Sequence, residues 1–338
     1  MKLTYEQIKS ITCGAVRYTI EEDGITFHRF TQAQHDMYEK KDEGFFDKSK
    51  TSSGVKLVFR TDSRMLYLDT TVKNARSRTY FSFDVFVEDR LIGCLDNFSD
   101  QDIPRDFSEI SFPVGRFGRT FNLGPGMKTV TIHLPWNKIT KLHSLCLSDG
   151  AVLEPVKPEK KLLVFGDSIT VGFDCLRPSR RQVVRLAQQL GAEEFNKCIG
   201  GERYCPDLSE LPEDFIPDYI YVAYGTNDYS CTNPEILAER SKKFFENLDK
   251  NYPDVKTFVI TPIWRVNYNT LERPFKSFFE IDEMIHALLA ERPNTVVIPG
   301  FDLVPHSVDY FGDYGLHPNM EGHDHYFENM WKEIQKAL

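Results

Sequence analysis

The sequence lacks the features that mark membrane-spanning, disulfide-stapled or metal-binding chains. No apolar stretch is long enough to span a bilayer, and Glu6 and Lys9 interrupt the N-terminus before the apolar core of a signal peptide could form. The seven cysteines are scattered and include no C-x-x-C pair, so they predict neither a disulfide framework nor a zinc or redox site. We expect reduced thiols and a cytoplasmic location, with a secreted protein whose signal was trimmed as the alternative.

The sequence also lacks an excess of positive charge. Lys and Arg number 41 against 50 Asp and Glu, which gives a net charge of −9, and no long basic cluster is present. Binding to phosphate groups would need such a cluster. We therefore expect neither nucleic acid nor a membrane as a partner, and the sequence leaves the oligomeric state open. With 41% hydrophobic and 27% charged residues the composition is that of an ordinary globular protein.

Two hydrophobic patterns divide the 338 residues. Up to about residue 155 the chain has short stretches rich in β-branched and aromatic residues, some of them alternating, as at Phe81, Phe83, Val85 and Val87. This predicts an antiparallel, jelly-roll-like β-sandwich over residues 1–155. The charged, proline-containing segment PVKPEKK follows as a linker. Residues 38–54 are polar enough to be interpreted as a solvated, mobile connection.

From residue 161 to 338, nearly continuous apolar runs alternate with helical spacings. The runs KLLVFGD, DYIYVAYG, KTFVITP and TVVIPG predict buried parallel strands, and the alternation predicts a three-layer α/β domain. In such sheets ligands bind beyond the carboxyl ends of the strands, where this sequence places its unusual polar residues.

Three polar loops follow successive strands and should converge on one crevice. GDSITVG puts Gly166, Asp167 and Ser168 where the first strand ends, with an exposed serine at the top of the sheet. The loops FNKCIGGERY and AYGTND contribute the pairs Gly200–Gly201 and Asn227–Asp228. Each loop taken singly could be an ordinary turn or helix cap.

One histidine of the nine stands out. His317 lies in GDYGLHPNMEGH, on a glycine- and proline-punctuated loop after the last strand. A metal site made of His317, His323, Asp324 and His325 is the alternative, but the H-E-x-x-H spacing is absent, and a solvated helix start is the favoured interpretation.

Taken together and in this order, GDSITVG, the paired glycines, GTND and GLHPN resemble the SGNH (GDSL-like) hydrolases. The resemblance implies a flavodoxin-like catalytic domain over residues 161–338, with Ser168 as nucleophile and His317 as general base. It also implies an oxyanion hole made of the Ser168 amide, the Gly201 amide and the Asn227 side chain. The chemistry requires neither a metal nor an organic cofactor.

One position departs from the family pattern. The family usually has an aspartate three residues before the histidine, where this chain has Tyr314, and Asp313 lies one residue further back. Either Asp313 is the third member of a triad, or a backbone carbonyl orients His317 in a dyad. Trp264 and Arg265 follow a strand end and are possible substrate-binding residues, although Trp264 could equally be packed against the sheet.

A sandwich ahead of such a domain also resembles the two-domain carbohydrate esterases, including acetylxylan esterases. We therefore expect a serine esterase that removes a short acyl group such as acetyl from a carbohydrate or small molecule. The alternatives are a lipase, thioesterase or arylesterase of the same family, and a carbohydrate-binding protein with an inactive hydrolase scaffold.

Overall fold

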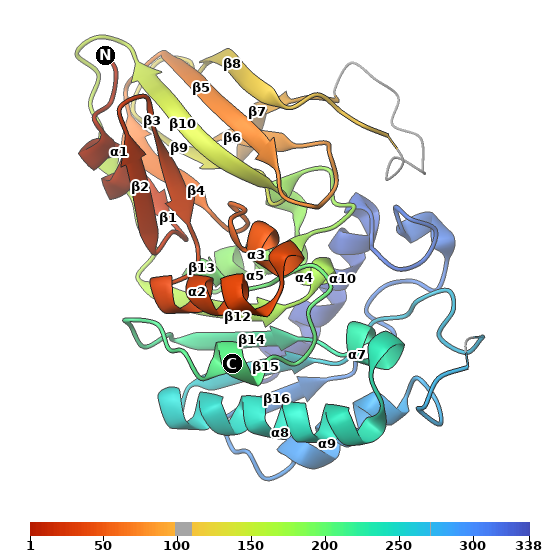
Figure 1. The fold of residues 1–338 in the computed structure, drawn as a ribbon. Helices are drawn as coiled ribbons and strands as arrows, with labels where there is room; N and C mark the ends of the chain where they lie inside the picture. Colours follow the sequence, from red (N-terminus) through yellow and green to blue (C-terminus); the bar gives the residue numbers. More distant parts are fainter. Residues whose placement is uncertain (99–109, 271) are drawn as a thin grey trace.

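The N-terminal part of the chain folds into two packed antiparallel sheets, as the alternating pattern predicts (Figure 1). The computed structural model describes residues 1–98, 110–270 and 272–338. One sheet has the order β1–β4–β9–β6–β7, with β11 beside β4, and the other has the order β2–β3–β10–β5–β8. The strands of the first sheet are β1 (Thr12–Cys13), β4 (Lys56–Thr61), β6 (Ser82–Val87), β7 (Arg90–Asp96), β9 (Lys128–His133) and β11 (Glu154–Pro155). Those of the second are β2 (Arg17–Glu21), β3 (Gly24–His28), β5 (Met65–Asn74), β8 (Gly115–Asn122) and β10 (Lys138–Leu147).

Period-two alternation explains the core of this sandwich. Phe83 and Val85 of β6 and Val130 and Ile132 of β9 are all at most 1% exposed and belong to one apolar cluster between the sheets. Because successive side chains of a strand point to opposite faces, these positions place one face of each strand inward. Helix α1 (Tyr5–Ile11) adds Ile8 and Ile11 to the same cluster.

The C-terminal part is built on a parallel five-stranded sheet. Its order is β13–β12–β14–β15–β16, in which the second strand along the chain lies outside the first. This is the flavodoxin-like order, so the predicted fold class is confirmed. The strands are β12 (Lys160–Gly166), β13 (Ala192–Asn196), β14 (Tyr219–Ala223), β15 (Lys256–Ile260) and β16 (Thr295–Ile298).

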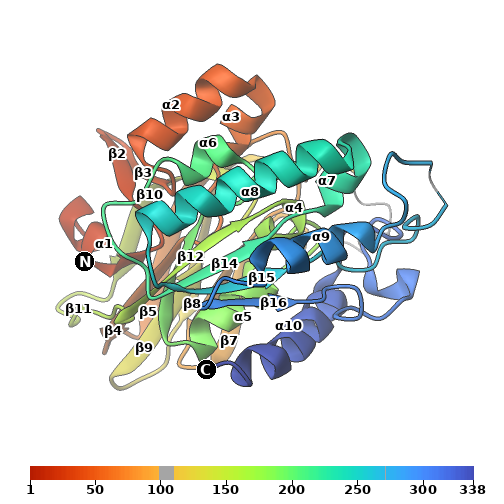
Figure 2. The same cartoon turned by 90° about the horizontal axis from the view of Figure 1, so that it is seen from below.

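Helices cover both faces of the parallel sheet and complete the three layers (Figure 2). On one face, α5 (Gln182–Gln189) and α10 (Met320–Gln335) pack against apolar side chains of the strands, and on the other face α8 (Pro234–Asn251) and α9 (Glu280–Leu289) do so. The shorter helical segments are α4 (Ser168–Val171), η2 (Pro178–Arg180), α6 (Pro206–Ser209), α7 (Thr226–Cys231) and η3 (Val308–Tyr310). In the described part of the chain, no helix combines the length and the apolarity that crossing a membrane requires.

Residues 38–54 are not the solvated connection that their polarity predicts. The structure has helices α2 (Gln32–Lys41) and α3 (Glu43–Ser49) there, each begun by a capping side chain, Thr31 and Asp42. Tyr38 is fully buried in the apolar cluster that covers one face of the parallel sheet, and residues 51–55 are buried as well. Tertiary burial of a few aromatic side chains therefore overrides the polar composition of the segment.

These helices also bear on the predicted division into residues 1–155 and 161–338. The antiparallel strands end at Pro155 and the parallel sheet begins at Lys160. However, Phe30 and Tyr38 from the first part share a core with Leu163 and Phe165 of β12. The division of the chain into these two domains stays a prediction.

Candidate active site

Ser168 lies at the carboxyl end of β12, at the point where the strand order reverses. β12 pairs with β13 on one side and β14 on the other, which makes this the switch point of the sheet, where ligands bind in such folds. Asp167 is the N-cap of α4, and its carboxylate accepts the Ile169 N–H at 2.9 Å. Ser168 is more enclosed than the sequence predicts, with an exposed fraction of 6%.

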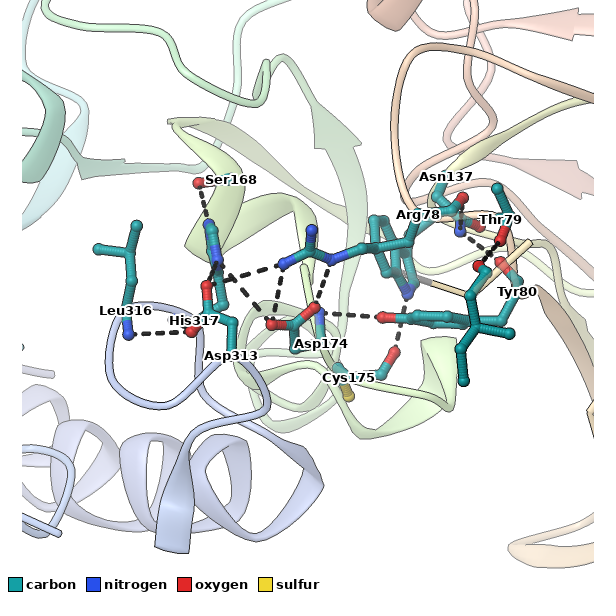
Figure 3. Close-up of polar contacts among 12 residues, drawn as sticks. Arg78, Thr79, Tyr80, Asn137, Ser168, Asp174, Cys175, Asp313, Leu316 and His317 are labelled. Atoms are coloured by element: carbon teal, nitrogen blue, oxygen red, sulfur yellow. Dashed lines mark hydrogen bonds and ion pairs between the residues drawn. The ribbon is translucent and has the colours of Figure 1, made fainter. Parts of the chain in front are cut away.

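Ser168, His317 and Asp313 form a continuous chain of polar contacts (Figure 3). His317 Nε2 lies 2.8 Å from Ser168 Oγ, and His317 Nδ1 lies 2.5 Å from Asp313 Oδ2. An ionised carboxylate can only accept a hydrogen bond, so the ring proton stays on Nδ1, and Nε2 is left free to accept the serine hydroxyl proton. The arrangement is therefore able to turn the serine hydroxyl into a nucleophile.

The loop before His317 brings Asp313 into this position. Tyr314 and Gly315 have φ values of +66° and +144°, which curl the chain between the two residues. Asp313 Oδ1 accepts the N–H groups of Leu316 and His317, at 3.0 and 2.9 Å. Burial acts to raise the pKa of Asp313, but the His317 side chain and these N–H groups outweigh it and hold the pKa below its ordinary value.

The glycine and asparagine loops predicted to form the oxyanion hole are linked to each other. Asn227, half-buried in α7, donates one Nδ2 hydrogen to the carbonyl oxygen of Glu202 at 3.0 Å, which fixes the amide and leaves its second hydrogen available. Gly201 has a φ of +87°, a conformation that favours glycine. The Gly200 carbonyl, in the same peptide unit as the Gly201 N–H, accepts Lys48 Nζ at 2.8 Å.

Trp264 and Arg265 are both largely buried. Trp264 is 8% exposed, stacks on His306 and contacts Phe311, which corresponds to the packed alternative. Arg265 is 7% exposed and donates to the Thr226 carbonyl at 3.2 Å and to the Ser230 hydroxyl at 2.8 Å. Both acceptors belong to α7, so Arg265 braces the helix that carries Asn227.

In the structure, two residues of the alternative metal site, His323 and Asp324, have other partners. His323 is fully buried rather than solvated, and its Nδ1 lies 2.6 Å from the Gln182 side chain. Asp324 is instead ion-paired with Arg180 and Arg185. Within the described ranges, Asp174, Asp313 and His317 do place potential ligand atoms within 4.8 Å of one another, but both Asp174 oxygens are bonded by Arg78.

Sequence reasoning missed Lys48, Arg78 and Asp174. Asp174 follows GDSITVG by only two residues, so an acidic residue close behind the serine could have drawn attention to it. No local signal marks Lys48 or Arg78, because each reaches the site from the N-terminal part of the chain, 152 and 96 residues away from its partner.

Comparisons with known proteins agree with this geometry. Residues 164–325 match the GDSL-like Lipase/Acylhydrolase family, and no curated protein matches the chain. Among solved structures, a putative GDSL-like lipase from Bacteroides ovatus is 18% identical with a TM-score of 0.78, covering 100% of this chain and 97% of that one. The salicylyl-acyltransferase SsfX3 of a tetracycline biosynthetic pathway is 19% identical with a TM-score of 0.77, covering 96% and 94%.

A family two carbohydrate esterase from Clostridium thermocellum, solved in complex with cellohexaose, is 12% identical with a TM-score of 0.67, and the match covers 96% of this chain and 98% of that one. At these identities the likeness establishes the fold, in both its sandwich and its α/β part. The family match rests on the region that holds Ser168, Asn227 and His317. Residues 164–325 thus match the GDSL-like Lipase/Acylhydrolase family, and this match supports a carboxylic ester hydrolase.

Proposed function

We propose that the protein is a serine esterase that hydrolyses short acyl esters, acetyl esters first among them, of a carbohydrate or small molecule. The observation that carries the proposal is the uninterrupted chain of contacts from Asp313 through His317 to Ser168. An inactive scaffold would have no need to keep a half-buried carboxylate, an imidazole and a hydroxyl within hydrogen-bond distance of one another.

In the proposed reaction His317 Nε2 takes the proton of Ser168 as Oγ attacks the ester carbonyl carbon. The resulting oxyanion is stabilised by the Ser168 and Gly201 amides and by the Asn227 side chain. His317 then gives its proton to the departing alkoxide, which leaves an acyl-serine, and the same residue activates a water that releases the acid. Asp313 keeps the imidazole in the required tautomer throughout.

Carbohydrate esters are supported as the substrate class by the fold neighbours. They include the family two carbohydrate esterase described above and an acetyl xylan esterase from Butyrivibrio proteoclasticus. Fold alone does not set a substrate, so the acyl group and the alcohol both need direct measurement.

The test is hydrolysis of 4-nitrophenyl esters of increasing chain length, followed by acetylated xylo-oligosaccharides, with wild type and Ser168→Ala. We expect the highest kcat/KM on the acetyl ester, acetate release from the oligosaccharides, and loss of both activities in the variant. A preference for long acyl chains would instead indicate a lipase. Equal rates for Ser168→Ala and wild type would remove Ser168 as the nucleophile.

A further inference from the structure

Two carboxylates, and not one, face the Nδ1 side of His317 (Figure 3). Asp313 Oδ2 lies 2.5 Å from Nδ1, and Asp174 Oδ2 lies 3.9 Å from the same atom. The Asp174 side chain is completely buried, with an exposed fraction of 0%. An Asp174 carboxylate without a partner cation would compete with Asp313 for the Nδ1 proton and would add a second negative charge beside the imidazolium.

Arg78 resolves this conflict by its position between the two carboxylates. It binds Asp174 through two parallel contacts, Nε to Oδ1 at 2.7 Å and a terminal guanidinium nitrogen to Oδ2 at 3.1 Å. The same terminal nitrogen lies 3.7 Å from Asp313 Oδ2. A two-pronged arginine–carboxylate pair is strong and fixes orientation, so the negative charge of Asp174 is matched in place. Burial acts to raise the pKa of Asp174, and this pairing opposes the rise.

Arg78 comes from the N-terminal part of the chain, in the segment between β5 and β6. The segment is itself clamped, since the Arg78 carbonyl accepts Asn137 Nδ2 at 3.0 Å and Lys138 Nζ at 2.7 Å. Two more contacts tie the sandwich to the loop after α4. The Tyr80 hydroxyl accepts the Asp174 N–H at 3.1 Å, and Trp136 Nε1 donates to the Cys175 carbonyl at 2.8 Å. The sandwich therefore holds both Arg78 and its partner in one rigid arrangement.

We propose that Arg78 is a positioning residue of the active site, which binds Asp174 and thereby reserves His317 Nδ1 for Asp313. The proposal rests on the proposed esterase function, because it assigns a role relative to the pair of His317 and Ser168. It also gives the N-terminal sandwich a part in catalysis beyond packing. Arg78 contacts the carboxylates of Asp174 and Asp313, so its effect passes through the charge and orientation of these two groups.

Other charged groups also surround His317 and its two carboxylates. Asp167 and His323 interact electrostatically with His317 from the start of α4 and from α10, and Arg265 interacts with Asp313. Lys138 faces the Arg78 carbonyl and Tyr80 faces the Asp174 amide. Substituting Arg78 or Asp174 leaves all of these groups in the chain. If the pH midpoint of Ser168 reactivity moves in opposite directions in the two variants, the cause is therefore the Arg78–Asp174 pair.

Ser168 reacts only when His317 is unprotonated, so its reactivity rises with pH. The charge removed by each substitution sets the direction in which the midpoint of this rise moves. Arg78→Met removes a positive charge and leaves Asp174 without its cation, which favours the protonated imidazole. The rate of reaction at Ser168 should then reach half its maximum about one pH unit higher than in wild type. Asp174→Asn leaves the Arg78 charge unmatched and should move the same midpoint to lower pH by a similar amount. The double variant restores the net charge and should lie close to wild type.

The experiment measures the rate at which a fluorophosphonate probe labels Ser168 between pH 5 and 9, with mass spectrometry to locate the label. The samples are wild type, Arg78→Met, Asp174→Asn and the double variant, with Ser168→Ala as the unlabelled control. Arg116→Met and Asp69→Asn serve as matched controls, because Arg116 binds Asp69 through the same two-pronged contact on the sandwich surface. They should label like wild type.

The two proposals fail in different ways. If wild type is not labelled at Ser168 at any pH, the esterase function fails. If wild type is labelled but the midpoints of Arg78→Met and Asp174→Asn coincide with its own, only the role of Arg78 is overturned, and slower labelling with no shift identifies a purely structural contact. If Arg78→Met does not fold, the downward shift of the isosteric Asp174→Asn decides by itself.

Discussion

Replacing Asp313 by asparagine should nearly abolish turnover, for a reason that the hydrogen bonds of the loop dictate. Asp313 Oδ1 accepts two backbone N–H groups, from Leu316 and His317. In Asp313→Asn the amide oxygen must stay with these donors, because an NH₂ group there would face two N–H groups. The NH₂ group is therefore placed against His317 Nδ1. It donates to Nδ1, so the ring proton moves to Nε2, and the ring loses its ability to accept the Ser168 proton.

The magnitude follows from the serine-protease precedent for this tautomer error, a loss of ~10⁴-fold, which corresponds to about 5 kcal/mol of barrier. The assay is kcat/KM on 4-nitrophenyl acetate, with circular dichroism to verify folding. Asp302→Asn is a matched control, since Asp302 and His306 form an Asp–His pair of the same spacing on an exposed loop, 3.1 Å apart. Near-normal activity of a folded Asp313→Asn enzyme would refute the reasoning and leave a Ser168–His317 dyad.

Three further predictions address the oxyanion hole and the buried carboxylates. Asn227→Ala should lower kcat roughly a hundredfold or more, and a change confined to KM would instead make Asn227 a ground-state binding residue. Lys48→Met should lower kcat about tenfold or more at constant KM, because the charged hydrogen bond to the Gly200 peptide is lost. Lys50→Met is the control. Equal kcat values for Lys48→Met and wild type would contradict a role of Lys48 in the oxyanion hole. Burial raises the pKa of Asp228 to about 7, with the backbone of Tyr204 opposing the shift. The folded chain therefore holds this proton to a higher pH than the unfolded chain, and wild type should lose stability between about pH 4 and 7. Asp228→Asn should escape that loss, so its free energy of unfolding should gain up to a few kcal/mol on wild type over this range, as measured by denaturation in urea, whereas a difference independent of pH would contradict the assignment.

The sequence by itself determined the fold class and the blocks around which the site is built. Alternation at Phe83 and Val85 and the continuous runs of β12 and β14 depend on short-range periodicity, which is written directly into neighbouring residues. Ser168 and Asn227 could be located for the same reason, since each follows its strand within a few residues. Their positions at the carboxyl edge of a parallel sheet follow from the connectivity alone.

Only the tertiary structure decided how these residues are supported. Whether Asp313 reaches His317 depends on the backbone turn at Tyr314 and Gly315, whose φ values the motif does not specify. Polarity misled the prediction for residues 38–54, where a buried Tyr38 holds two helices against the α/β part. Lys48 and Arg78 reach partners 152 and 96 residues away. Such contacts arise from the packing of whole layers against one another, and no local spacing in the sequence encodes them.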